Sequence, residues 1–146
     1  MTKLSVNLNK IALIRNSRGR NNPNILEFVK IAIDSGADGV TLHPRPDARH
    51  ATEKDVDSIK NFLVNFPDIE LNIEGNPFHN LLPIVKNIHP TQCTFVPDEI
   101  GAITSTKGWD LGKSAYKLSP EIIQLKKVGV RVSLFMNPLP LQIKLA

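Results

Sequence analysis

The sequence has a single cysteine, Cys93, so an internal disulfide framework is excluded. No apolar run approaches the ~18 residues of a membrane-spanning helix, and residues Met1 to Leu4 lack the apolar core of a signal peptide. We therefore expect a protein of the reducing cytoplasm without a membrane partner. Because Cys93 lies inside an apolar run, we expect it to be a small buried hydrophobe.

Aromatic residues make up only 5% of the chain, and its Lys and Arg residues form no block. The net charge of +4 and the pI near 9.3 suit acidic partners. A nucleic-acid platform needs stacking aromatics and clustered basic residues, so we expect phosphorylated small molecules and no nucleic acid. Absence of salt-dependent DNA retention would dismiss the nucleic-acid alternative.

Motifs of metal, nucleotide and acyl-enzyme chemistry are absent from the sequence. The four histidines have no i, i+4 pair and none of the cysteines of a zinc site, so we expect no metal. No Gly-x-Gly-x-x-Gly follows the first predicted strand, and neither a Walker loop nor a Gly-x-Ser-x-Gly elbow occurs. Dinucleotide binding and serine-hydrolase chemistry are therefore disfavoured.

Strand-like and helix-like segments alternate five times along the 146 residues. Period-two alternation or short apolar runs predict strands at 4–8, 40–42, 69–74, 92–96 and 130–136. Helical spacing and capping signals predict helices at 22–36, 52–66, 78–88 and 119–129. The first of these would be capped by Asn22 with Pro23 at its first position, and polar loops would fill 9–19 and 98–113.

Such alternation predicts an α/β fold with a parallel sheet and right-handed crossovers. We expect a (β/α)8 TIM barrel that is incomplete here, with residues 1–146 as one partial domain, because a full barrel needs ~200–250 residues. Unclosed strands would leave two open edges and an apolar barrel-facing surface. We therefore expect the chain alone to be poorly stable or aggregation-prone, and a sharp reversible unfolding of a monomer would contradict this.

A basic loop follows the second predicted strand, where parallel sheets bind their ligands. It is stiffened by Pro44 and Pro46. Its imidazole and guanidinium groups belong to His43, Arg45, Arg49 and His50. Two imidazoles and two guanidiniums suit an acid/base site for a phosphorylated substrate, although a solvated basic turn is the alternative for each residue alone.

Glu74 ends the third predicted strand, on the face opposite Leu71 and Ile73. The same alternation makes Glu70 and Asn72 candidates for the barrel interior. An inward carboxylate is costly unless paired or used, and burial raises its pKa, which suits a general base. A surface glutamate at a strand end is the alternative.

Polar side chains also follow the first and fourth predicted strands. Those after the first strand are Asn7, Asn9, Lys10, Arg15 and Arg18. Those after the fourth are Thr104, Ser105 and Thr106. Lys and Arg can hold phosphate, and Asn, Ser and Thr can hydrogen-bond hydroxyls or anions, but solvated loops explain both groups equally well.

Six segments, taken in order, resemble the pyridoxine 5′-phosphate synthase family of deoxyxylulose-dependent vitamin B6 biosynthesis. They are Val6–Ala12, Arg15–Gly19, Gly36–Arg45 with Arg49 and His50, Leu71–Glu74, Val96 and Pro97 with Thr104, and Val132–Phe135. The resemblance implies a cofactor-free barrel enzyme, homo-oligomeric in its full-length form. It would condense 3-amino-2-oxopropyl phosphate with 1-deoxy-D-xylulose 5-phosphate and release phosphate and water.

The resemblance also implies roles for individual residues. The acid/base residues would be His43 and Glu74; the aminoketone phosphate would bind Asn7 and Arg18; deoxyxylulose phosphate would bind Arg45, His50 and Thr104. Many family members have Asp-His where this chain has Asn9 and Lys10, so we expect these two to face the substrate with altered contacts.

The family's second catalytic histidine, a later glutamate and the Gly-rich phosphate loop have no counterpart in these 146 residues. An inactive remnant or an assembly-dependent fragment of the enzyme is therefore the main alternative, and we expect little or no turnover from the chain alone. Another phosphate-handling barrel enzyme, such as an isomerase or aldolase, is a further alternative.

Overall fold

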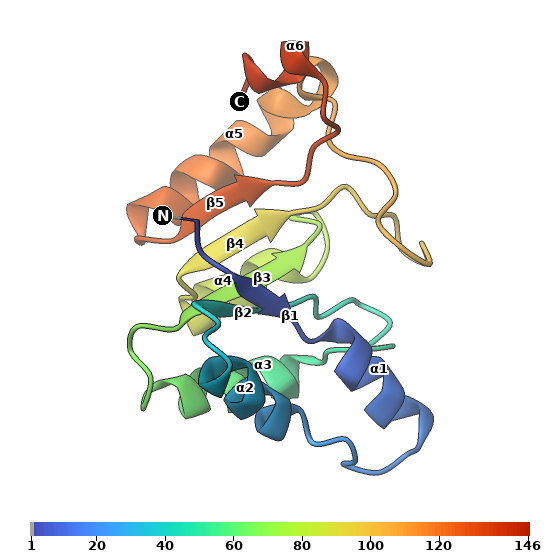
Figure 1. Cartoon of the computed structure of the whole chain (residues 1–146). Helices are drawn as coiled ribbons and strands as arrows, with labels where there is room; N and C mark the ends of the chain where they lie inside the picture. Colours follow the sequence, from blue (N-terminus) through green and yellow to red (C-terminus); the bar gives the residue numbers. More distant parts are fainter. Residues whose placement is uncertain (1) are drawn as a thin grey trace.

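Five strands lie side by side in the order in which they occur in the chain, and all run parallel (Figure 1). The computed structural model describes residues 2–146, and its strands are β1 (Ser5–Asn7), β2 (Gly39–Leu42), β3 (Glu70–Gly75), β4 (Gln92–Phe95) and β5 (Arg131–Leu134). A doubly wound sheet would reverse its strand order, whereas a (β/α)8 barrel does not. The predicted α/β class and the incomplete barrel arrangement are confirmed.

Helices connect successive strands and cover one face of the sheet; α4 lies behind it in Figure 1. The helices of the described residues are α1 (Asn9–Ser17), α2 (Ile25–Asp34), α3 (Glu53–Leu63), α4 (Leu81–Ile88), α5 (Leu111–Lys127) and α6 (Pro140–Ile143). Within residues 2–146, none of them has the length and apolar character needed to cross a bilayer.

The predicted start of α2 and the predicted loop before it are both wrong. Helix α1 occupies the segment predicted as a polar loop, because Leu8 and Ala12, one helical turn apart, are buried against the core. The next helix begins at Ile25, where the Asn24 side chain accepts a hydrogen bond from the amide of Leu26. In contrast, the capping box of Thr52 and Asp55 at the start of α3 is confirmed.

Helix α5 begins at Leu111, well before the predicted start at Ser119. Asp110 caps it by accepting from the amide of Gly112. The buried side chains that hold it on the sheet are Leu111, Leu118 and Leu125. Their burial outweighs the loss of one backbone hydrogen bond at Pro120, which lies inside the helix.

The apolar side chains of the strands face the helices. Val40, Leu42, Ile73 and Phe95 are fully buried in one core with the helical side chains. Cys93 belongs to this core, as predicted, and burial raises the pKa of its thiol to about 12.

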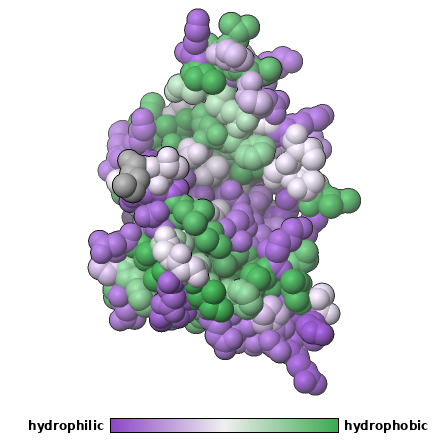
Figure 2. Space-filling model, in the orientation of Figure 1, coloured by the Kyte–Doolittle hydropathy of each residue, from purple (hydrophilic) through white to green (hydrophobic). Residues whose placement is uncertain are grey.

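The opposite face of the sheet is polar, so the apolar barrel-facing surface expected from the sequence is wrong. Asn72 lies at its centre: its amide nitrogen donates to the Thr41 hydroxyl at 3.2 Å, and its oxygen accepts from the Thr94 hydroxyl at 2.9 Å. Nearer the strand starts, Glu70 binds Lys3 and Arg131. Figure 2 shows hydrophilic side chains gathered in the middle of this view, where the sheet face lies. Alternation along each strand therefore sends apolar groups to the helices and polar groups inward.

Candidate active site at the carboxyl ends of the strands

The carboxyl ends of β1 and β3 bring Asn7 and Glu74 together across the intervening β2. Asn7 Nδ2 donates a hydrogen bond of 3.2 Å to Glu74 Oε2. The register that pairs Asn7 with Thr41, and Thr41 with Asn72, sets both residues at the same edge of the sheet. Sequence alternation predicted this inward direction for Glu74, and the structure agrees.

The carboxyl group of Glu74 is half-buried on the polar face. Burial raises its pKa above the ordinary value, and the hydrogen bond from Asn7 partly opposes that rise. A carboxyl group with a raised pKa can exchange a proton nearer to neutral pH, which is what acid/base chemistry requires.

His43 directly follows β2 and is buried, with 6% of its surface exposed. Its backbone amide donates to Asn9 Oδ1 at 2.8 Å, and the amide of Asn9 donates to Asn7 Oδ1 at 2.9 Å. Asn7 at the end of β1 and Asn9 at the start of α1 therefore hold the backbone at His43 in place. Asn9, predicted to contact substrate, has its oxygen engaged with the protein, and only its amide nitrogen remains for a ligand.

Burial and, after it, the positive charge of Arg45 lower the pKa of His43 to about 4. Its imidazole is therefore neutral at pH 7 and can accept a proton. The pKa of His50 is also lowered, by burial and then by Arg45. The Nδ1 atom of His50 is buried and has no hydrogen-bond partner among residues 2–146.

Arg45 fastens the loop after β4 to the end of β2. Its guanidinium binds Asp98 Oδ2 at 2.8 Å and the carbonyl oxygen of Ala102 at 2.5 Å, and the Ser105 hydroxyl donates to the same Asp98 oxygen at 2.8 Å. The pocket beside Arg45 and His43 holds only about 20 Å³. In this arrangement Arg45, a predicted phosphate ligand, is already paired.

Four predicted substrate-binding residues are exposed, namely Asn7, Lys10, Arg18 and Thr104. Arg18 lies just after α1 and lines a separate hollow of about 310 Å³ with Arg20 and Asn22. Direct contacts link Asn7, Asn9, His43, His50 and Glu74 in one chain. Arg45 joins this group by lining the same small pocket as His43. For Lys10, Arg18 and Thr104, no contact with these residues is found within the described part of the chain.

Sequence reasoning missed two residues that shape the site, Asp98 and Asn16. Asp98 follows β4 and Pro97, a strand-end position that could have marked it. Asn16 gives no comparable signal, because its contacts are with residues distant in sequence. Within residues 2–146, no group of three or more His, Cys, Asp or Glu side chains is arranged to hold a metal ion.

A profile of the family described as "Pyridoxal phosphate biosynthesis protein PdxJ" matches residues 4–146. The chain belongs to this family. It is 48% identical over 141 residues to a pyridoxine 5′-phosphate synthase of Cytophaga hutchinsonii, with 94% of this chain and 56% of the relative covered. It is 46% identical over 144 residues to the protein of the same name from Albidiferax ferrireducens, with 95% and 57% covered.

A third relative, the pyridoxine 5′-phosphate synthase of Leptospira biflexa, is 43% identical over 148 aligned positions, with 94% of this chain and 57% of the relative covered. The chain therefore spans a little over half the length of the curated relatives it matches. The PdxJ family is the one expected from the sequence, so that prediction is confirmed.

Proposed function

We propose that this chain carries the acid/base and phosphate-binding residues of a pyridoxine 5′-phosphate synthase. The reaction joins 3-amino-2-oxopropyl phosphate to 1-deoxy-D-xylulose 5-phosphate and releases phosphate and water. The observation that carries the proposal is the pairing of Asn7 with Glu74 at the same strand edge that holds a neutral His43. Imine formation, dehydration and ring closure need repeated proton transfers, and these two groups suit that work.

In this proposal, His43 accepts protons as a neutral imidazole, and Glu74 accepts or returns them through its raised pKa. Asn7 orients the Glu74 carboxyl group and, with Arg18, binds the aminoketone phosphate. Arg45, His50 and Thr104 bind deoxyxylulose phosphate, with Asn9 and Lys10 beside them. A phosphate reaching Arg45 would exchange with Asp98, since two anions cannot share that buried guanidinium without cost.

Binding of deoxyxylulose phosphate tests the phosphate site. Trp109 is the chain's one tryptophan, and its indole N–H donates to the carbonyl oxygen of Phe95 at the end of β4, so its fluorescence reports on this edge of the sheet. We expect saturable binding of 1-deoxy-D-xylulose 5-phosphate and none of unphosphorylated 1-deoxy-D-xylulose. His50→Gln should weaken binding ~10-fold, by loss of one charge-assisted or polar phosphate contact.

The matched control is His89→Asn, because His89 is exposed in a left-handed conformation that asparagine tolerates. It should bind like the unsubstituted chain. Equal binding of the sugar with and without phosphate would overturn the proposal.

Turnover tests the acid/base pair. Residues 1–146 can be joined to the part of the Cytophaga hutchinsonii relative that the match does not cover, and the formation of pyridoxine 5′-phosphate can then be measured. His43→Ala and Glu74→Gln should each lower the rate ~10²–10⁴-fold. Near-normal rates for both would refute the assigned roles. Homo-oligomeric assembly and a cytoplasmic location stay predictions, the first to be checked by analytical ultracentrifugation.

A further inference from the structure

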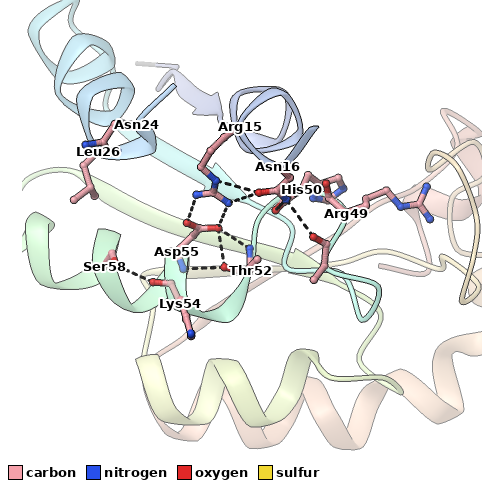
Figure 3. Close-up of polar contacts among 11 residues, drawn as sticks. Arg15, Asn16, Asn24, Leu26, Arg49, His50, Thr52, Lys54, Asp55 and Ser58 are labelled. Atoms are coloured by element: carbon pink, nitrogen blue, oxygen red, sulfur yellow. Dashed lines mark hydrogen bonds and ion pairs between the residues drawn. The ribbon is translucent and has the colours of Figure 1, made fainter. Parts of the chain in front are cut away.

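The side chain of Asn16, in the last turn of α1, reaches three successive carbonyl groups of the loop after β2 (Figure 3). Its Nδ2 atom lies 3.2 Å from the oxygen of Ala48, 3.1 Å from that of Arg49 and 2.7 Å from that of His50. The two N–H groups of this amide are therefore shared among three backbone acceptors that would otherwise face solvent.

The other end of the Asn16 carboxamide is fixed by Arg15. Asn16 Oδ1 accepts from Arg15 Nε at 3.1 Å and Nη2 at 2.9 Å. Arg15 in turn binds both carboxylate oxygens of Asp55, with Nη2 to Oδ2 at 2.8 Å. Asp55 also accepts from the amide of Thr52 at 2.8 Å, as part of the capping box of α3. The carboxamide is thus oriented by a pair that joins α1 to the start of α3.

The loop after β2 includes a residue with an unfavourable backbone conformation, close to the carbonyl groups that Asn16 contacts. Ala48 has a φ of 51°, a left-handed conformation that costs free energy for a residue with a side chain. Two residues later, the imidazole of His50 lies against that of His43, with ring centroids 5.7 Å apart. A change in the backbone at 48–50 would therefore move the His50 ring relative to His43.

We propose that Asn16 is a positioning residue of the site. Its amide nitrogen sets the backbone of residues 48–50 and so places the His50 imidazole beside His43, while Arg15 and Asp55 hold the carboxamide in the required orientation. The relevance of this placement for substrate rests on the proposed function, in which His50 contacts deoxyxylulose phosphate. The placement of the His50 ring by Asn16 does not depend on the proposed function.

The decisive variant is Asn16→Asp, which keeps the size of the side chain and an acceptor for Arg15 but replaces the donor with an oxygen facing three carbonyls. Asn65→Asp is the matched control: Asn65 is exposed, and within residues 2–146 its side-chain amide contacts only the nearby carbonyl of Phe62. The readout is the set of imidazole ¹H–¹³C signals of His43 and His50 in the ligand-free 146-residue chain.

We expect Asn16→Asp to shift the signals of both histidines and to raise the Kd for 1-deoxy-D-xylulose 5-phosphate ~10-fold. Asn65→Asp should leave the signals and the Kd unchanged. Unshifted His50 signals in a folded Asn16→Asp variant would overturn the inference. Failure of the unsubstituted chain to bind the sugar phosphate would refute the proposed function alone, because the histidine signals still report on Asn16.

If Asn16→Asp does not fold, the unsubstituted chain decides the matter. Nuclear Overhauser effects between the side-chain amide protons of Asn16 and the protons of residues 48–50 support the inference, and their absence overturns it. A second variant, Asn16→Ala, removes the donor without introducing a charge and should shift the His50 signals in the same way.

Discussion

The imidazole rings of His43 and His50 lie edge to face, with centroids 5.7 Å apart and planes inclined by 60°. Both pKa values are lowered, first by burial and then by the positive charge of Arg45. Two neutral imidazoles therefore stand side by side next to a guanidinium. Neutral imidazoles can accept a proton at pH 7, which is what the proposed acid/base role of this site requires.

The pH dependence of stability follows from His43. Its pKa falls from 6.5 to about 4 on folding, so between these values the unfolded chain binds more protons than the folded one. Stability should therefore fall as the pH drops from 6.5 towards 4, by up to ~3 kcal/mol from this residue. Urea unfolding at a series of pH values measures the slope. His43→Gln should reduce the slope of stability against pH. An unchanged slope would show that the pKa of His43 is not lowered in the folded protein.

Glu74→Gln should stabilise the protein at pH 7 while impairing acid/base chemistry. Burial raises the pKa of Glu74 in the folded state, so the unsubstituted chain loses stability as the pH rises from its ordinary value near 4.5 through the raised one. Glutamine has no charge to bury, so the variant does not lose this stability at higher pH. The stabilisation relative to the unsubstituted chain should vanish below pH ~4.5. Thermal unfolding at pH 7 and pH 4 measures it. Glu27→Gln, on the exposed side of α2, is the control and should show little gain at either pH.

Loss of Asp98 should destabilise the site strongly. Asp98→Ala leaves the guanidinium of Arg45, 6% exposed, buried without its carboxylate, which costs ~3–5 kcal/mol. Asp34→Ala removes the exposed pair between Lys30 and Asp34 and should cost no more than ~1 kcal/mol. Equal effects of the two substitutions on urea unfolding would show that the buried Arg45–Asp98 ion pair contributes no more to stability than an exposed pair.

The polar face of the sheet depends on Asn72. Asn72→Ala removes the acceptor of the Thr94 hydroxyl and one of the two partners of the Thr41 hydroxyl, which keeps Ser5 Oγ at 2.8 Å; we expect a cost of ~1–3 kcal/mol. Asn61→Ala, on the exposed side of α3, should stay within ~0.5 kcal/mol. Comparable urea midpoints for the two variants would contradict a structural role for the network.

Local patterns predicted the strands, the capping box of Thr52 and the inward direction of Glu74 correctly, because each depends on residues adjacent in sequence. The polar loop predicted at 98–113 instead contains the start of α5. Pro120 suggested that the helix starts at Ser119. The burial of Leu111 and Leu118 stabilises the longer helix by more free energy than the missing hydrogen bond at the proline costs. Tertiary packing therefore outweighed the local preference of proline for a helix start, and local sequence patterns carry no information about that packing.

The amino-acid order determined which chemical groups lie at the ends of the first three strands: an amide at Asn7, an imidazole at His43 and a carboxylate at Glu74. Only the tertiary structure decided that Arg45 is paired with Asp98, that Asn16 holds the backbone before His50, and that the pKa of His43 falls. The physical reason is that hydrogen bonds, ion pairs and burial depend on distances between segments far apart in the chain. Alternation within one strand determines to which face of the sheet a side chain points. The neighbouring strands and loops determine which groups surround that side chain.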